Sequence, residues 1–252
     1  MTNYQKLLNN LEYLKLNQFK VNLDSMIDIV NKNQKTFVDA LYELTQIEVL
    51  AKDQRAINAC VKVAGFPFIK TLKDFDFNYQ PSLNKAHIQD LATCRFLERK
   101  ENIIFIGTPG VGKTHLATSI GIEAASARKI TYFISCHDLI LQLKKAHYEN
   151  NLEKRIKHFN KYRLLIIDEV GYLPIDEEGS NLFFQLISKR YEKSSVIITT
   201  NKPLSKWVEI FHDPVTTNAI LDRLLHHSQI INIIGRSYRI KDKLDLLSKE
   251  GD

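Results

Sequence analysis

The sequence predicts an α/β fold in which a parallel five-stranded sheet is flanked by helices and preceded by a small helical module. From about residue 85 onward, short apolar runs alternate with helical patterns, as is typical of a parallel sheet wrapped by helices. The apolar run 103–106 leads into the segment Gly-Thr-Pro-Gly-Val-Gly-Lys-Thr at 107–114, and a helical pattern follows it. Residues 1–65 show helical periodicity and no strand pattern.

The N-terminal residues are expected to fold as a separate helical module. Apolar side chains recur at helical spacing in two stretches, Leu7, Leu8, Leu11 and Leu14, and then Leu23, Met26, Ile27 and Val30. The segment from Thr36 to Asp39 has the form of a capping box that opens a long helix. Gly65, followed by Pro67, ends it. We therefore assign 1–65 to the helical module, 66–84 to an aromatic linker and 85–252 to the α/β domain.

Five apolar segments of the α/β domain have the length and composition of buried strands. They are 103–106, 130–135, 163–167, 195–200 and 229–234.

The segment 107–114 is a complete phosphate-binding loop, G-x-x-x-x-G-K-[ST]. Its glycines allow backbone N–H groups to surround a phosphate, and the helix that follows directs its positive end at the same point. Lys113 is expected to reach the β- and γ-phosphates, and the Thr114 hydroxyl to hold Mg²⁺. The sequence therefore predicts ATP and Mg²⁺ as ligands. The predicted nucleotide-binding residues are Gly107, Thr108, Pro109, Gly110, Val111, Gly112, Lys113, Thr114 and His115.

Two carboxylates follow the third apolar segment, at Asp168 and Glu169. A buried parallel strand delivers both to the carboxyl edge of the sheet, where ligands bind in such folds. Asp168 is suited to hold Mg²⁺ together with Thr114, and Glu169 to polarise a water aimed at the γ-phosphate. The pair therefore predicts hydrolysis of ATP to ADP and phosphate. The alternative is a strand that ends in a polar turn.

Three further side chains are candidates for the catalytic set. Asn201 follows the strand 195–200 and is suited to orient the attacking water, although Asn at a strand end is more often a turn residue. Arg223 and Arg239 lie in the C-terminal part of the chain, where an arginine supplied to the γ-phosphate stabilises charge in the transition state. From the residues alone, a structural ion pair is the commoner role for each arginine, for example between Arg223 and Asp222.

Composition excludes several classes of protein. The chain has 252 residues, of which 44% are hydrophobic and 25% charged, as in ordinary soluble globular proteins. It has no signal-peptide pattern and no apolar run of membrane-spanning length. The three cysteines are far apart, and the eight histidines show no metal-ligand spacing, so a disulfide framework or a zinc site is not expected. These features favour a cytoplasmic protein that does not enter membranes.

Most of the net charge of +6 is concentrated in one stretch. Residues 144–163 contain seven basic and two acidic residues, a net charge of +5, with aromatic side chains between them. Such a stretch suits a phosphate backbone, but a solvated helix face is an equally good explanation. The candidate DNA-binding residues are Lys144, Lys145, Lys154, Arg155, Lys157 and Lys161.

Several motifs resemble those of IstB-like ATP-binding proteins, the helper ATPases of bacterial insertion sequences. Besides the loop at 107–114, they are Leu-Ile-Ile-Asp-Glu-Val-Gly-Tyr-Leu-Pro at 165–174, Ile-Thr-Thr-Asn at 198–201, Trp207, Ala-Ile-Leu-Asp-Arg-Leu at 219–224 and Gly-Arg-Ser-Tyr-Arg-Ile at 235–240. The resemblance extends over essentially the whole chain. Replicative helicase loaders are the near relatives and share the Asp-Arg and Ser-Tyr-Arg elements.

The resemblance implies a P-loop ATPase of the AAA+ class, of the initiator type. It implies that the Asn201 strand lies between the loop strand and the Asp168 strand, so that Asn201 is the first sensor. It also implies that Arg223 is an arginine finger acting on the neighbouring subunit's ATP, and that Arg239 is the second sensor. An arginine finger that acts in trans requires a homo-oligomer. The basic stretch 144–163 would be the extra helix that faces DNA.

The function expected from the resemblance is that of a transposition helper. Such a protein oligomerises on double-stranded DNA without sequence preference, hydrolyses ATP, and recruits or stimulates the transposase encoded by the same element. The alternative is a replicative helicase loader. A metabolic kinase that uses the same loop is disfavoured because the basic stretch would have no purpose in it.

Overall fold

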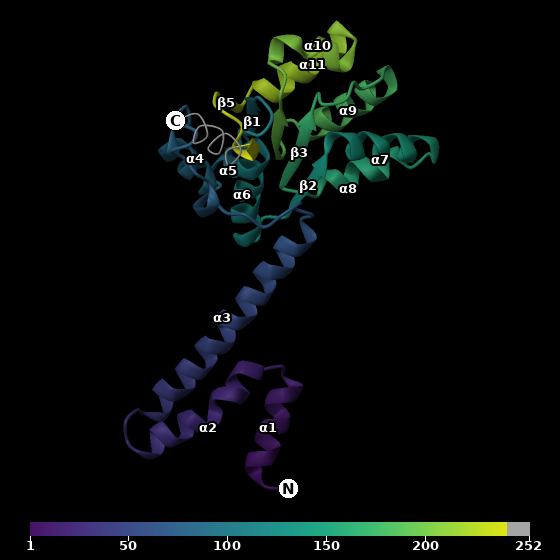
Figure 1. The fold of residues 1–252 in the computed structure, drawn as a ribbon. Helices are drawn as coiled ribbons and strands as arrows, with labels where there is room; N and C mark the ends of the chain where they lie inside the picture. The colour runs from purple at the N-terminus through teal and green to yellow at the C-terminus, as the bar shows by residue number, and fades with distance from the viewer. Residues whose placement is uncertain (241–252) are drawn as a thin grey trace, which may run out of the picture. The chain divides into compact units, whose positions relative to one another are not determined.

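The computed structural model describes residues 1–240 and divides into two compact units (Figure 1). The first unit is Met1–Ala59, and the second begins at Cys60. The long helix α3, Phe37–Val63, contributes to both. The domain boundaries after residues 65 and 84 stay predictions. No helix among residues 1–240 combines the length and the apolar character needed to cross a membrane.

The first unit contains α1 (Asn3–Tyr13), α2 (Asn17–Asn31) and most of α3. Its small core comprises Leu11, Phe19, Leu23, Met26, Ala40 and Leu44. The N-cap residue of α2, Leu16, offers no side-chain hydrogen bond, so this helix end needs a partner from elsewhere. The buried carboxylate of Glu48 on α3 provides it and accepts the N–H groups of Gln18 and Phe19 at 2.6 and 3.1 Å.

The second unit is built on a five-stranded, all-parallel sheet in the order β2-β3-β4-β1-β5. The strands are β1 (Asn102–Gly107), β2 (Thr131–Ser135), β3 (Leu164–Val170), β4 (Ser195–Thr200) and β5 (Ser228–Ile233). All five predicted strands are confirmed to within a few residues. The predicted position of the Asn201 strand, between the loop strand and the Asp168 strand, is also confirmed.

Helices cover both faces of this sheet (Figure 1). Successive strand residues point to opposite sides, and because they are apolar on both sides, each face is buried under helices. Ile103, Phe105 and Ile166 pack in one core beneath α4 (Lys85–Ala92), α5 (Phe96–Arg99) and α6 (Lys113–Ser126). Ile104 and Ile167 pack in the other core. That core is covered by α7 (Cys136–Tyr148), α8 (Leu152–Asn160), α9 (Glu177–Arg190), α10 (Val208–Phe211) and α11 (Pro214–Leu225).

The aromatic segment 66–84 is part of the second unit and packs against its core. Three of its rings contact the core beneath α6, those of Phe66, Phe75 and Phe77. A short 3₁₀ helix, η1 (Leu72–Asp74), lies between Phe66 and Phe75 in the chain. The hydroxyl of Ser119 on α6 donates to the Lys70 carbonyl at 3.0 Å. Two further 3₁₀ turns, η2 (Leu204–Lys206) and η3 (Tyr238–Ile240), follow β4 and β5.

Candidate nucleotide-binding site

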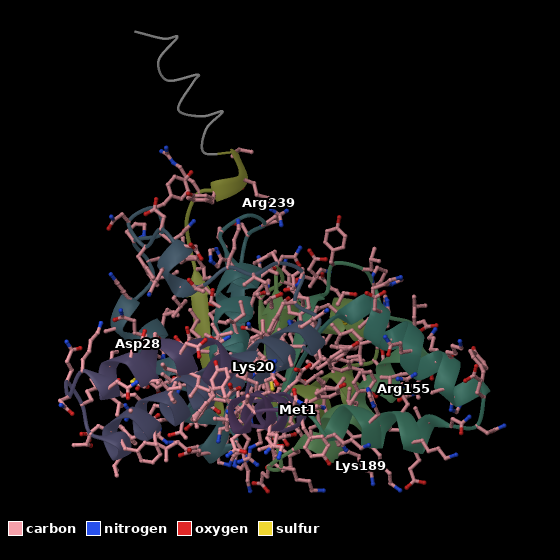
Figure 2. The ribbon with its side chains drawn as sticks, turned by 90° about the horizontal axis from the view of Figure 1, so that it is seen from below. Met1, Lys20, Asp28, Arg155, Lys189 and Arg239 are labelled. Carbon is pink, nitrogen blue, oxygen red and sulfur yellow. The ribbon has the colours of Figure 1, made fainter. Side chains whose placement is uncertain are left out.

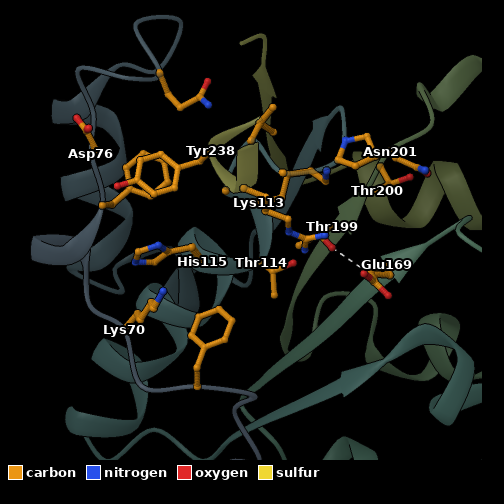
Figure 3. A pocket seen from close by; sticks show the side chains of 18 of the residues that line it. Lys70, Asp76, Lys113, Thr114, His115, Glu169, Thr199, Thr200, Asn201 and Tyr238 are labelled. Carbon is orange, nitrogen blue, oxygen red and sulfur yellow. Dashed lines mark hydrogen bonds between the residues drawn. The ribbon is translucent and has the colours of Figure 1, made fainter. Parts of the chain in front are cut away.

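A cavity of about 420 Å³ opens at the carboxyl edge of the sheet, where β1, β3 and β4 end (Figure 3). In Figure 3, Lys113, Thr114 and Glu169 face the same space, and Tyr238 and His115 border it on another side. The cavity is therefore assembled from five separate parts of the chain. They are the loop 109–115, the ends of β3 and β4, the segment 68–80 and the C-terminal residues Tyr238 and Arg239.

The loop conformation requires glycine at two positions. Gly110 and Gly112 have φ angles of +82° and +98°, in the left-handed region. A Cβ on Gly110 would lie 2.0 Å from Ser237 Oγ, and one on Gly112 would lie 2.5 Å from a ring carbon of Phe75. No side chain caps the start of α6, so its first N–H groups can receive an anion.

Lys113 is held inside this loop. Its Nζ donates to the carbonyl oxygens of Gly107 and Thr108 at 2.8 and 2.9 Å. Burial lowers the pKa of Lys113, while the nearby Asp168 carboxylate opposes that shift. Hydrogen bonds to two neutral carbonyls only partly replace the hydration that a buried ammonium loses. Negatively charged phosphate oxygens would be stronger partners. The predicted phosphate contact therefore fits the loop as it is folded.

Asp168 and Thr114, the predicted Mg²⁺ residues, lie in contact. The Thr114 hydroxyl is 3.0 and 3.2 Å from the two carboxylate oxygens of Asp168. Asp168 is buried, and burial raises its pKa, although hydrogen bonds from Thr199 and Thr114 act in the opposite direction. A carboxylate beside a hydroxyl that lines the cavity offers the oxygen ligands that Mg²⁺ prefers.

Glu169 lies at an irregularity in the sheet. The β3–β4 register shifts between Ile167 and Val170, and Glu169 has φ +61°. Its N–H donates to Thr199 Oγ1 at 2.9 Å, a bond marked in Figure 3. Bulges of this kind re-aim side chains beside active sites. The Glu169 carboxylate is therefore exposed at the cavity, whereas Asp168 stays buried beside it.

Thr199 is a residue of this site that the sequence patterns did not predict. It accepts the Glu169 N–H, and its own hydroxyl donates to Asp168 Oδ1 at 2.5 Å. One buried hydroxyl thus fixes both carboxylate-bearing residues. The only sequence signal was a hydroxyl residue at the end of an apolar strand, which is too common to single out.

Asn201 and Arg239 both line the cavity, as the predicted sensor roles require. Asn201 directly follows β4. Arg239 is close enough that its charge contributes to the pKa values of Lys113 and Asp168.

Arg239 is positioned by an anchored segment that precedes it, residues 234–238. The segment is fixed to 79–82 and to the phosphate loop by four hydrogen bonds. They are Ile234 N to Ser82 Oγ at 3.1 Å, Gln80 Nε2 to Arg236 O at 2.9 Å, Tyr79 Oη to Ser237 O at 3.3 Å and Tyr238 N to Gly110 O at 2.9 Å. The aromatic segment 66–84 thus helps to shape the site, which no local sequence pattern indicated.

Arg223 does not line this cavity. Its guanidinium donates to the Ala219 carbonyl at 2.8 Å and lies over the Phe184 ring, 4.8 Å from its centroid. Within the described residues it forms no ion pair with Asp222, so that alternative is not supported. Any contact between Arg223 and a nucleotide would therefore have to be made with another subunit's site.

The basic stretch 144–163 forms the end of α7, all of α8 and the residues after it. Some of its cations lie beside carboxylates. Lys144 bonds to Asp176, Lys145 lies 3.9 Å from Glu149, and Lys157 lies 3.0 Å from Glu153.

Other cations of the stretch face solvent. Lys154 and Lys161 are exposed and have no acidic partner among residues 1–240. Arg155 lies over the ring of Phe159. It projects, with Lys189 of α9, on the same side of the α/β unit (Figure 2).

Asp168→Asn is expected to stabilise the protein in the absence of nucleotide and Mg²⁺. Because burial raises the pKa of Asp168, the folded chain binds a proton more readily than the unfolded chain. The free energy of unfolding therefore falls as pH rises from the pKa of Asp168 in the unfolded chain to its higher pKa in the folded chain. Asn does not ionise, so the variant avoids that loss. Calorimetry at neutral pH should give a higher Tm for the variant, with a difference that shrinks toward acid pH. An equal or lower Tm at neutral pH would contradict this account.

The whole chain is similar to proteins of one family. A family model described as IstB-like ATP binding protein matches residues 9–246. A protein named as the ATP-binding protein of insertion sequence IS232, from Bacillus thuringiensis subsp. berliner, is 55% identical over 249 residues. That match covers 99% of this chain and 98% of the relative. The corresponding protein of IS5376 from Geobacillus stearothermophilus is 44% identical over 219 residues, 87% of each chain.

Solved structures share the fold of this chain over about two thirds of its length. The DnaC helicase loader is similar over 69% of this chain and 98% of its own, with a TM-score of 0.51 and 24% identity. DnaA from Aquifex aeolicus, bound to AMPPCP, is similar over 71% of this chain and 55% of its own, with a TM-score of 0.55 and 20% identity. The predicted AAA+ fold, with its helical N-terminal region, is confirmed.

Proposed function

Because the chain belongs to the family of IstB-like ATP-binding proteins, we propose that it is a Mg²⁺-dependent ATPase that helps an insertion sequence to transpose. In this proposal it oligomerises on double-stranded DNA without sequence preference in the cytoplasm. There it recruits or stimulates the transposase of the same element. The observation that carries the proposal is the convergence of Lys113, Thr114 and Glu169 on one cavity beside a phosphate loop, with Asp168 buried against the Thr114 hydroxyl.

Each of these residues has a separate task in ATP hydrolysis. Lys113 and the N–H groups at the start of α6 bind the phosphates. Thr114 and Asp168 hold Mg²⁺, which supplies positive charge to the phosphate oxygens when bound. Glu169 accepts a proton from the attacking water, and Asn201 orients that water. Arg239 contacts the nucleotide of its own subunit.

The position of Arg223 supports the proposed oligomer. The side chain lies outside its own cavity, so it can act as an arginine finger only across a subunit interface.

Contact with DNA is assigned to the outer face of α8. Ile156 and Phe159 are buried, so the opposite face of this helix is open to solvent. Lys154, Lys157 and Lys161 follow one another at spacings of three and four residues, which places their charges along one side. A row of lysines suits binding to the phosphate backbone, which is independent of sequence.

Lys113→Ala tests the nucleotide assignment. Removal of the ammonium should lower ATP affinity by roughly tenfold to a hundredfold or more, because charged hydrogen bonds to the phosphates are lost. The measurement is titration with a fluorescent ATP analogue, accompanied by sizing with and without duplex DNA. Lys100→Ala, at an exposed lysine that does not line the cavity, is the matched control. Unchanged ATP affinity in folded Lys113→Ala would overturn the site. Oligomers on DNA that form equally well without ATP would contradict ATP-dependent assembly.

Charge reversal on α8 tests the DNA assignment. Changing Lys154, Lys157 and Lys161 together to Glu should weaken binding to duplex DNA. It should also reduce the slope of log affinity against log salt by about one for each DNA phosphate that the variant no longer neutralises. ATP binding by the free subunit should hardly change, since none of the three lines the cavity.

The control for this experiment carries the same change in total charge at another place. Arg95, Arg99 and Lys100 are exposed on and beside α5, and their reversal to Glu should leave more of the affinity and salt slope intact. If both triple variants lose DNA binding equally, total charge rather than α8 controls the interaction.

A replicative helicase loader is the second candidate, since DnaC shares the fold. The relatives that match nearly the full chain, at 55% and 44% identity, are named for insertion sequences, which favours the transposition helper. Binding to purified transposase of the neighbouring gene, compared with binding to the replicative helicase, separates the two.

A further inference from the structure

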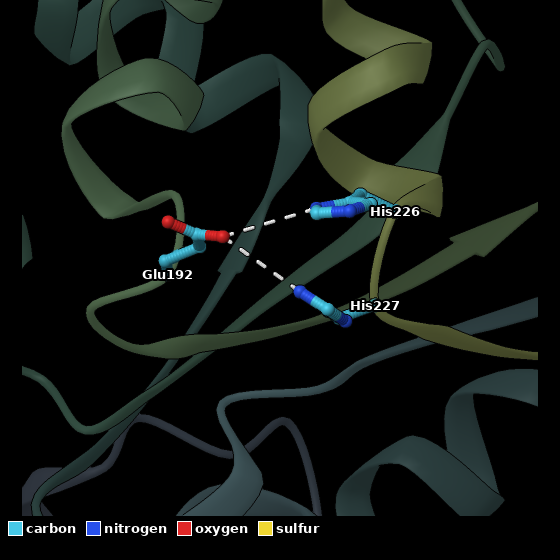
Figure 4. A group of neighbouring side chains, drawn as sticks. All are labelled: Glu192, His226 and His227. Atoms are coloured by element: carbon cyan, nitrogen blue, oxygen red, sulfur yellow. Dashed lines mark ion pairs between the residues drawn. The ribbon is translucent and has the colours of Figure 1, made fainter.

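A group of three possible metal ligands lies apart from the nucleotide cavity, where the end of α9 faces the end of α11 (Figure 4). Glu192 Oε1 is 3.9 Å from His226 Nδ1 and 3.7 Å from His227 Nε2. One donor atom of each residue lies within 4.8 Å of the other two. Figure 4 shows both imidazole rings directed toward the same carboxylate.

The backbone that carries Glu192 is firmly anchored. Glu192 lies in a turn after α9, closed by hydrogen bonds from Lys193 and Ser194 to the Arg190 carbonyl at 2.9 and 3.1 Å. Arg190 is itself buried and donates to the carbonyls of Phe159, Tyr162 and Ser195.

The histidine side of the group is fixed as well. The His226 N–H donates to the Asp222 carbonyl at the end of α11, and the His227 carbonyl accepts from Asn102 on β1 at 2.7 Å. Only the side chains therefore have to adjust when a ligand binds.

The ring of His226 already directs its Nδ1 atom toward this group. Nδ1 lies 2.6 Å from the Tyr191 hydroxyl, and the rings of His226 and His227 are 4.0 Å apart. When Tyr191 donates in this bond, Nδ1 is unprotonated and its single lone pair is directed at the Tyr191 hydroxyl. An incoming cation would replace that hydrogen bond.

We propose that Glu192, His226 and His227 form a binding site for a divalent transition metal ion of the zinc type. Two imidazoles and one carboxylate are the ligand set of open tetrahedral zinc sites, in which water completes the coordination. With metal–ligand bonds of about 2.1 Å, the donor atoms of such a site lie roughly 3.4 Å apart. The two histidine–glutamate distances need only a few tenths of an ångström of contraction, which half-exposed side chains can supply.

A metal ion here would link the turn after α9 to the end of α11. Arg223 lies on that helix one turn before His226, and its guanidinium rests on Phe184 of α9. The site would thus restrain the pairing of the two helices that hold Arg223 in place. Metal binding itself does not depend on the proposed ATPase function.

The test is Zn²⁺ binding to the untagged, nucleotide-free chain, measured by calorimetry in excess Mg²⁺, which masks sites made of oxygen ligands alone. We expect one Zn²⁺ per chain. His227→Ala and Glu192→Gln should each weaken binding by roughly tenfold or more, since even the loss of a residue that only orients a ligand costs that much at metal sites. A Tm rise of roughly 5 °C is expected at a hundredfold excess of Zn²⁺ over its Kd.

His147→Ala is the matched control, because His147 is an exposed histidine on α7, outside the group. It should bind Zn²⁺ as the unmodified chain does. Circular dichroism verifies that each variant is folded. The proposal is overturned if the unmodified chain binds no Zn²⁺ at micromolar concentrations. It is equally overturned if His227→Ala and Glu192→Gln bind as tightly as His147→Ala.

Discussion

Glu169→Gln is expected to keep ATP and Mg²⁺ binding while slowing hydrolysis by roughly a hundredfold to ten-thousandfold, the usual contribution of a general base. Asp168, buried beside Thr114 and Thr199, remains in place to hold the metal ion. The exposed carboxylate that accepts the water's proton is removed, but the Glu169 N–H bond to Thr199 is not, since it belongs to the backbone. The measurement is phosphate release at saturating ATP, with nucleotide affinity determined in parallel.

The expected consequence is a longer-lived ATP-bound oligomer on DNA, visible as slower dissociation after dilution. Glu177→Gln is the matched control, because Glu177 is an exposed carboxylate in the first turn of α9 that does not line the nucleotide cavity. If Glu169→Gln turns over ATP as fast as Glu177→Gln, then Glu169 is only a turn residue at the bulge.

Arg223→Ala is expected to lower ATP hydrolysis by roughly a thousandfold or more, the effect typical of an arginine finger. ATP binding by the free subunit should remain near normal, because Arg223 contacts Ala219 and Phe184 rather than the cavity. The measurement combines single-turnover hydrolysis with nucleotide titration.

Mixing two inactive variants shows whether Arg223 acts across an interface. A Lys113→Ala subunit has an intact Arg223 and a defective cavity, and an Arg223→Ala subunit has the reverse. Together they can form an interface with one complete site, so activity should rise above that of either variant alone. In the control, the Arg223→Ala subunit is mixed with the double variant Lys113→Ala/Arg223→Ala. This mixture contains no intact Arg223, so its activity should not rise. If sizing shows mixed oligomers and activity stays flat, Arg223 is not a finger in trans.

Local patterns in the sequence were sufficient to predict the strands of the second unit and their parallel arrangement. Each strand is a short apolar run, and the alternation with helices leaves a parallel sheet as the arrangement that buries both of its faces. Local patterns also predicted the loop at 107–114 and the Asp168–Glu169 pair, because the chemistry of each is carried by contiguous residues. The position of β4 between β1 and β3 followed from the resemblance and not from periodicity.

What the sequence determined by itself was the identity of the sheet, the phosphate loop and the carboxylates that end β3. The tertiary structure decided which distant side chains meet them. Thr199 reaches Asp168 and Glu169 only because β3 and β4 pair with a register shift, and Gln80 reaches Arg236 across more than a hundred residues of chain. Glu192 likewise meets His226 and His227 only where α9 and α11 end side by side. Contacts of this kind depend on packing and register between elements, which local residue patterns do not encode.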